Sequence, residues 1–118
     1  MNSKKWSLEV NGYRIAPLAD LAGANLKDAD LTRTDLTKAI LEHANLAGAN
    51  MTEANLTGAN LSNADLSNAR LTGAYMAYSK LTSTNLFGAH LMYANLTGAN
   101  LTGAYLTGVT MPDGSIHD

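Results

Sequence analysis

The dominant pattern of the chain is one apolar residue that recurs at every fifth position, from Leu21 to Met111. An α-helix turns by about 100° per residue, so a residue repeated every five positions drifts around the axis and builds no stripe. Side chains of a plain strand alternate with period two, so an odd period would send successive leucines to opposite faces. The chain must therefore change direction once in each of these nineteen consecutive units. The central residues, position i below, are Leu21, Leu26, Leu31, Leu36, Leu41, Leu46, Met51, Leu56, Leu61, Leu66, Leu71, Met76, Leu81, Leu86, Leu91, Leu96, Leu101, Leu106 and Met111.

The other positions of each unit predict how the chain turns. Position i−2 carries a small residue such as Ala24 or Ala54, and position i+2 carries Gly in eight units. Position i−1 is Asn or Asp in twelve units, and position i+1 is Thr or Ser in eleven. A two-residue spacing places i−2 and i on the same side of an extended piece, while Gly and Asn at i+2 tolerate the backbone angles of a bend. The pattern predicts a tube with Ala and Leu inside, polar residues outside and a corner at i+2.

The repeat also carries a family resemblance. The sequence Ala-Asn-Leu-Thr-Gly, at residues 54–58, 94–98 and 99–103, resembles the motif of the pentapeptide-repeat proteins. This resemblance implies an all-β fold, a right-handed quadrilateral β-helix with four units per coil and about five coils. Residues twenty apart would then stack above one another.

The pattern divides the chain into three segments. Residues 1–18 are predicted to form an N-terminal β-hairpin cap that includes Trp6, because two alternating runs flank Asn11-Gly12, the strongest short hairpin signal. Residues 19–113 form the β-helix, and residues 114–118 form a C-terminal cap or tail after a Pro-Asp-Gly turn. We expect Ile116 to fold back over the last leucine layer. With a cap predicted at each end, we expect a complete small protein.

Composition fits one domain with a core of Leu and Ala. The chain has 118 residues, a formal net charge of −2 and no Cys. Each central Leu or Met contributes roughly 1.5–3 kcal/mol on burial, before chain entropy is subtracted, so the core needs no disulfide or metal. No apolar run approaches the length that spans a bilayer, and the N-terminal residues are too polar for a signal segment. We expect no membrane segment and a cytoplasmic location, with a removed presequence and a periplasmic or lumenal location as the alternative.

Residues that could perform chemistry do not converge, so we expect no enzyme activity, cofactor or metal. His43 and His90 fall on different sides of the tube, and there is no Cys. The acids of the first coil interleave with Lys27, Arg33 and Lys38, which is typical of a solvated mixed-charge rim. Stacked Asn and Thr columns are normal stabilisers of such a tube. The alternative, an ice-binding face, lacks the usual Thr-x-Thr on its outward positions.

The outer surface departs from the motif in the C-terminal half. Exposed aromatics, Met and Arg in a polar surface have the composition of an interface core. Two alternatives stay open: these units only tolerate larger outward residues, or they form a protein contact or a homodimer seam. The candidate interaction patch comprises Arg70, Tyr75, Tyr78, Phe87, His90, Met92, Tyr93 and Tyr105.

These observations favour a non-enzymatic scaffold that presents a rigid face to an unknown protein partner. The family resemblance implies an alternative, a DNA mimic that binds a type II topoisomerase such as gyrase. A mimic should show a continuous negative stripe, whereas residues 19–113 carry eight acids and five bases, and the acids gather toward the N-terminus. Direct nucleic-acid binding is not expected, because the chain has no basic stripe.

Overall fold

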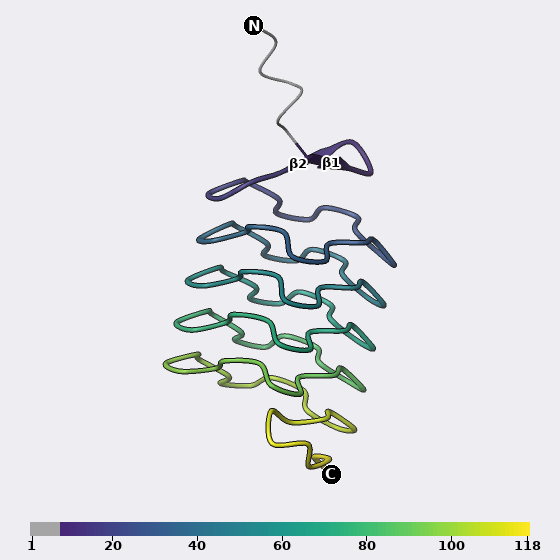
Figure 1. The fold of residues 1–118 in the computed structure, drawn as a ribbon, viewed down its shortest axis with the longest axis vertical. Coiled ribbons are helices and arrows are strands. Elements are labelled where there is room, and N and C mark those ends of the chain that lie inside the picture. The colour runs from purple at the N-terminus through teal and green to yellow at the C-terminus, as the bar shows by residue number, and fades with distance from the viewer. Residues whose placement is uncertain (1–7) are drawn as a thin grey trace, which may run out of the picture.

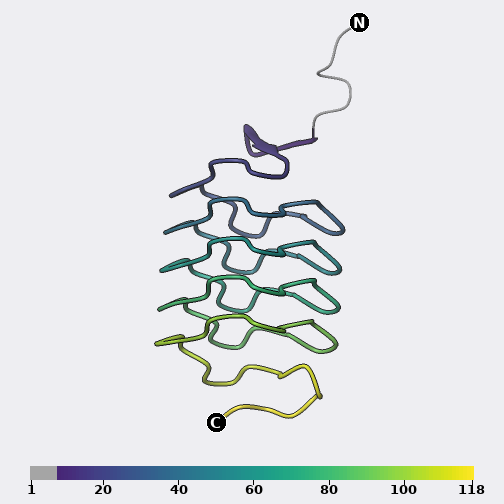
Figure 2. The ribbon, with the colours of Figure 1, turned by 90° about the vertical axis from the view of Figure 1, so that its left-hand side faces the viewer.

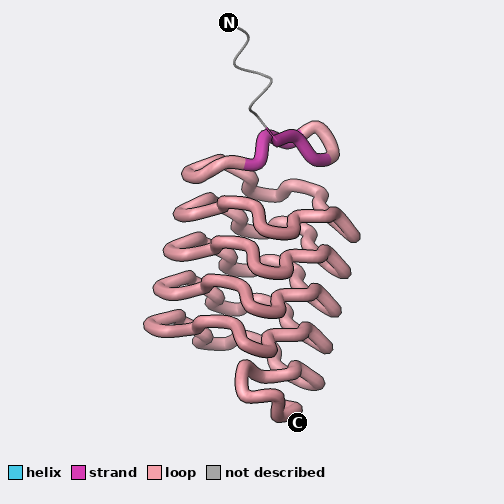
Figure 3. The backbone as a smooth tube through the Cα atoms, viewed as in Figure 1, coloured by secondary structure: helices cyan, strands magenta, loops and turns pink. Residues whose placement is uncertain are grey.

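The chain winds into a tube of stacked coils, as the computed structural model shows for residues 8–118 (Figure 1). Parallel bridges join residues twenty apart, from Asp20 with Ile40 to His90 with Thr110, so four units complete one coil. The coils lie one above another in both side views (Figures 1 and 2). Among residues 8–118 there is no helix, and each rung is a single bridge residue between two turns, drawn as loop in Figure 3. This architecture confirms the predicted all-β, right-handed quadrilateral β-helix.

The tube has four sides, which we number by their central residues. Each side stacks every fourth unit, so its outward columns can be read along the tube. Side 1 contains Leu21, Leu41, Leu61, Leu81 and Leu101; side 2 contains Leu26, Leu46, Leu66, Leu86 and Leu106; side 3 contains Leu31, Met51, Leu71, Leu91 and Met111; side 4 contains Leu36, Leu56, Met76 and Leu96.

Every backbone N–H group of a typical unit has a partner, as residues 54–58 illustrate. The Ala54 N–H closes the preceding turn at 3.0 Å, and the Asn55 N–H bonds to the coil before at 2.8 Å. The N–H groups of Leu56 and Gly58 bond to the next coil at 2.6 and 2.9 Å. The Thr57 N–H, which no rung reaches, bonds to the Asn55 side-chain Oδ1 at 3.0 Å. Full satisfaction of the buried backbone explains why one five-residue pattern can repeat through the tube.

The core consists of the residues at i and i−2, as the pattern predicts. The central residues from Leu26 to Leu91 are fully buried. Thr34, Ser79 and Thr84 replace Ala at position i−2, and each hydroxyl donates to a backbone carbonyl oxygen at 2.7 or 2.8 Å. These buried hydroxyls therefore do not remain unpaired.

A hairpin covers the N-terminal end of the tube. Strand β1 (Leu8–Val10) pairs antiparallel with β2 (Tyr13–Ile15) through the turn at Asn11-Gly12. Ile15 is buried and belongs to the core. The predicted hairpin is confirmed over these residues, while Trp6, expected in the same cap, lies outside the described residues.

The C-terminal segment covers less of the core than expected. Residues 112–118 turn back so that Ile116 bridges antiparallel with Thr110, beside the buried Val109. The Ile116 side chain stays 63% exposed, so the expectation that it covers the last leucine layer is wrong. This segment, residues 112–118, which we call the C-terminal return, follows one side of the last coil only. Four central residues of that end stay partly exposed: Leu96, Leu101, Leu106 and Met111.

Candidate interaction surface

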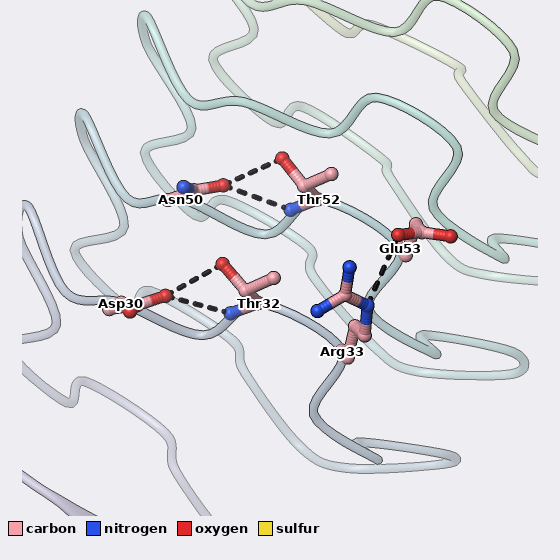
Figure 4. Close-up of polar contacts among 6 residues, drawn as sticks. All are labelled: Asp30, Thr32, Arg33, Asn50, Thr52 and Glu53. Carbon is pink, nitrogen blue, oxygen red and sulfur yellow. Dashed lines mark hydrogen bonds and ion pairs between the residues drawn. The ribbon is translucent and has the colours of Figure 1, made fainter.

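The outward Asn and Asp residues at position i−1 hold the backbone of their own unit. The Asp30 Oδ1 accepts the Thr32 N–H at 3.1 Å and the Thr32 hydroxyl at 2.7 Å. Asn50 makes the same two contacts with Thr52, at 3.1 and 2.7 Å (Figure 4). We call the bond from the N–H at i+1 to the Oδ1 at i−1 the Asx clasp, whether or not a hydroxyl at i+1 adds the second contact. Asp and Asn are interchangeable in it because both present an Oδ1 acceptor. These residues stack, as expected, and their side chains also satisfy the N–H that the rungs leave free.

The clasps also explain the acids of the first coil. The Thr32 hydroxyl, and then the Thr32 N–H, hold the pKa of Asp30 below its usual value. Thr37 does the same for Asp35. The one ion pair among residues 8–118 joins the Arg33 Nε to the Glu53 Oε1 at 3.2 Å, on an exposed corner (Figure 4). Asp30 and Asp35 are thus held by hydroxyl and amide donors rather than by the neighbouring bases.

Seven units lack the clasp, because another residue type occupies position i−1. In six of them the N–H at i+1 has no hydrogen-bond acceptor within residues 8–118, and in the seventh this position is Pro112. One missing hydrogen bond of this kind lowers stability by about 0.5–1.5 kcal/mol. Four of the seven belong to the predicted patch, so these side chains are not the choice that best stabilises the fold. The seven residues are Ile40, Arg70, Tyr75, Lys80, His90, Tyr105 and Thr110.

The structure brings two pairs of the predicted patch together. Phe87 and Tyr105 stack on side 2, with ring centroids 6.0 Å apart and an interplanar angle of 14°. Arg70 and His90 are bridge partners on side 3, and Met92 lies two residues further along that side. The sequence placed these residues in one region without singling out the stacked ring pair.

The remaining members lie on other parts of the tube. Tyr75 occupies side 4, between Asn55 and Asn95 in the same column. Tyr78 and Tyr93 occupy two different corners, where they are 70% and 76% exposed. The eight residues therefore wrap around three sides of the C-terminal half instead of forming one flat patch. We call this set the aromatic belt.

Charge does not form a stripe on any side of the tube. The side 3 column at position i−1 begins with Asp30, passes through Asn50 and continues with Arg70, and no acid follows in it. The side 1 column begins with Asp20 and later contains Lys80. Among residues 8–118 no group of three or more His, Asp or Glu side chains is placed to hold a metal ion. No helix able to cross a membrane occurs in the same range.

Comparison with known proteins agrees with this geometry. The pentapeptide repeats family model matches residues 18–52, 49–86 and 69–108, with eight copies. A pentapeptide repeat protein from the thylakoid lumen of Arabidopsis thaliana is similar in structure, with 35% identity over 85% of this chain and 70% of that chain, and a TM-score of 0.79. Comparison with curated proteins gives no match.

Two cyanobacterial structures are also similar. The pentapeptide repeat protein Rfr23 from Cyanothece 51142 is 36% identical over 84% of this chain, with a TM-score of 0.63. A pentapeptide repeat protein from Nostoc PCC 7120 is 42% identical over 72% of this chain, with a TM-score of 0.50. The matches span 64% and 62% of those two chains. The chain therefore belongs to the pentapeptide repeat family.

Proposed function

We propose that this protein is a non-catalytic scaffold that presents the aromatic belt to a protein partner. The observation that carries the proposal is the loss of the Asx clasp where belt residues occupy position i−1. Tyr75, His90 and Tyr105 each give up a backbone hydrogen bond that Asn would supply. Exposed aromatic side chains of this kind act as anchors in protein interfaces.

The rigidity of the tube supports the same role. Its rungs are bonded to both neighbouring coils, so belt residues on adjacent coils keep a fixed spacing. A preorganised surface loses little conformational entropy on binding. The belt therefore needs no rearrangement before it can accept a partner.

The test compares the wild type with a variant that returns three belt residues to the residue types of the repeat, Tyr75→Asn, Met92→Thr and Tyr93→Gly. A matched control, Ile40→Asn, makes the same kind of change in the N-terminal half. Immobilised protein is exposed to an extract of the source organism, and captured proteins are quantified. We expect the belt variant to lose a protein that wild type and control both retain. Equal capture by all three would overturn the proposal.

The gyrase-binding alternative finds no support in the charge distribution. Each outward column that begins with an acid continues with neutral or basic residues, such as Asn50 and Arg70 on side 3. A duplex mimic needs sustained negative potential along its length. We therefore expect no inhibition in a gyrase supercoiling assay, and dose-dependent inhibition would reverse this preference.

The location stays a proposal with two outcomes. We propose a cytoplasmic location, while the similar Arabidopsis protein comes from the thylakoid lumen. Fractionation of source cells with an antibody against the chain distinguishes the cytoplasm from a lumenal or periplasmic space.

A further inference from the structure

Two buried hydroxyl groups on side 1 have no hydrogen-bond partner. Among the residues that the structure describes, only the Ser62 Oγ and the Thr82 Oγ1 are buried side-chain polar atoms of this kind. Ser62 is only 6% exposed. Both residues occupy position i+1 on side 1 in adjacent coils, so their hydroxyls belong to one outward column. Buried polar groups without a partner are costly and rare, so this coincidence calls for an explanation.

The Thr82 unit also has a backbone donor without an acceptor. Lys80 occupies position i−1, so the Asx clasp is missing and the Thr82 N–H has no acceptor within residues 8–118. One coil later, the Asn100 Oδ1 accepts the Thr102 N–H at 3.0 Å and the Thr102 hydroxyl at 2.7 Å. The Thr82 unit thus has both donors of a complete clasp but no oxygen that accepts them.

The charge beside these donors is positive. Lys80 is exposed, and within residues 8–118 no carboxylate lies at ion-pair distance from it. In the outward columns of side 1 the acid nearest to Lys80 is Glu42, whose Oε1 instead accepts the Asn60 Nδ2 at 2.6 Å. A lysine ammonium group has three donors and no acceptor. The arrangement therefore suits a negatively charged oxygen.

We propose that Ser62, Lys80 and Thr82, which we call the side 1 site, bind a carboxylate group. One carboxylate oxygen takes the position that the Asn100 Oδ1 has in the next coil, where it accepts the N–H and the hydroxyl of Thr82. The Lys80 ammonium group supplies the opposite charge, and the Ser62 hydroxyl donates from the coil before. Hydrogen bonds to an ionised acceptor are roughly twice as strong as those between neutral groups.

The repeat itself shows that a carboxylate oxygen fits this position. The Asp65 Oδ1 accepts the N–H and the hydroxyl of Ser67 at 2.9 and 2.7 Å. An external carboxylate reproduces these two contacts and keeps its second oxygen for the other groups of the site. The carboxylate can belong to a free carboxylic acid or to an Asp or Glu side chain of a protein, because the chemistry at the site is the same.

The other units without a clasp lack one part of this arrangement. Arg70 precedes Thr72 on side 3, but the hydroxyl of Thr52, one coil earlier, already bonds to an Asn side chain at 2.7 Å. The remaining units have no cation at i−1 or no hydroxyl at i+1. Side 1 carries no residue of the aromatic belt, so the side 1 site is independent of the proposed function.

Amide NMR of the full chain during a titration with sodium acetate at pH 7 tests the site at the Thr82 N–H. A hydrogen bond to a carboxylate should move this proton resonance downfield until the site is saturated, relative to sodium chloride at equal ionic strength. The Ala77 N–H is the internal control, because it also lacks an acceptor within residues 8–118 but follows Tyr75 instead of a cation. If Thr82 moves no more than Ala77, or equally in chloride, the proposal is overturned.

A matched pair of variants locates the site. Lys80→Asn supplies an internal Oδ1 to the Thr82 N–H and should bind acetate at least about tenfold more weakly than wild type. Ile40→Asn restores a clasp in the same column two coils earlier, so it should leave the Thr82 response unchanged. An undiminished response in Lys80→Asn, or an equal loss in both variants, overturns the proposal.

Ser62→Ala separates ligand binding from folding. This change removes a hydroxyl that has no partner, so the melting temperature without acetate should not fall. The rise in melting temperature that saturating acetate produces should be smaller than in wild type, because a ligand stabilises the folded state in proportion to its affinity. A clear fall in the melting temperature without acetate, with the acetate response intact, would mean that this hydroxyl serves the fold and would overturn its place in the site.

A second ligand distinguishes the two sources of the carboxylate. A capped glycine-rich pentapeptide with one central Asp is titrated in the same way as acetate. Binding at least about tenfold tighter than that of acetate supports a carboxylate carried by a protein. Equal affinity supports a free carboxylic acid. Failure of both ligands to shift the Thr82 resonance overturns the site itself.

Discussion

The ring of Tyr78 lies against Gly98 of the next coil, so closely that a Cβ atom at residue 98 would come within 2.6 Å of its Cδ1 and Cε1 atoms. The same relationship recurs at other corners, where Asp28 lies over Gly48 and Asn68 over Gly88. In these columns a large corner residue in one coil is followed by glycine in the next. In these two columns, which follow sides 2 and 4, a large side chain alternates with glycine from coil to coil up to residue 98.

Gly98→Ala should lower the free energy of unfolding by about 2–4 kcal/mol, because it adds a clash with Tyr78 to the strain of a positive φ. Gly23→Ala has a matched φ of +69° and no atom within 4 Å, so it should cost only about 1–2 kcal/mol. Chemical denaturation followed by circular dichroism measures both. Adding Tyr78→Gly should recover about 1 kcal/mol or more of the Gly98→Ala loss as coupling energy. Equal costs at the two glycines would contradict corner packing.

Removal of a clasp should have a measurable cost where no belt residue is involved. Asn55→Ala deprives the Thr57 N–H of its acceptor at 3.0 Å and should destabilise the protein by about 0.5–1.5 kcal/mol. Asn55→Asp keeps the acceptor and should stay close to wild type at neutral pH. In the same column Tyr75→Asn can supply the missing acceptor to Ala77, so it should preserve or raise the melting temperature. A clear loss of stability in Tyr75→Asn would mean that this tyrosine serves the fold.

Acid should weaken the first coil through Asp30 and Asp35. Their pKa values are lowered in the folded protein by the hydroxyl and N–H groups of Thr32 and Thr37. A depressed folded pKa contributes stability above the unfolded value near 3.8, and this contribution is lost as the pH falls through the lowered pKa. The double variant Asp30→Asn, Asp35→Asn introduces the residue type that Asn50 has at the equivalent position one coil later. Its melting temperature at pH 7 should stay within about 3 °C of wild type.

The same double variant should lose less stability than wild type between pH 5 and pH 2, about where carboxylate linkage acts. Thermal melts at a series of pH values measure the difference. If the melting temperatures of the two proteins fall equally as the pH is lowered, these two carboxylates do not contribute to the acid sensitivity of the fold.

Two leucines in one column should differ in their contribution to stability. Leu61→Ala removes a fully buried side chain and should cost about 2–5 kcal/mol. Leu101→Ala acts in the last coil, where the side chain is partly exposed, and should cost about 1–2 kcal/mol in the dilute protein. Denaturation at low protein concentration measures both. If the cost of Leu101→Ala rises with protein concentration, Leu101 is covered in an assembly.

Sequence reasoning recovered the columns, the corners and the hairpin because each depends on one residue type at one spacing. The Leu series and Ala24-type positions placed the core, and Asn11-Gly12 placed the hairpin turn. The number of units per coil came from the family resemblance, since a five-residue period alone does not fix it. The bridges twenty residues apart confirm that number.

Other features depend on side-chain direction, which a repeat pattern does not encode. Stacked columns and the Asx clasp require the same residues, so only coordinates show that Asn50 bonds within its own unit. The stack of Phe87 on Tyr105 depends on how the rings stand on side 2. Ile116 was misjudged because its apolar character suggested burial, whereas the backbone of the return takes it along one side of the tube. Whether the belt binds a partner stays a prediction.

The twenty-residue spacing of the bridges constrains how this chain can change in length. Loss of one full lap, such as residues 41–60, would join Ile40 to Leu61 and leave every downstream column in place. A change of a single unit would keep leucine inside, yet it would rotate everything beyond it by a quarter turn relative to the hairpin. Burial of the core would be the same after such a change, so core packing does not select against it. The side on which Phe87 and Tyr105 lie, relative to the N-terminal half, is kept only when the length changes by a multiple of twenty residues.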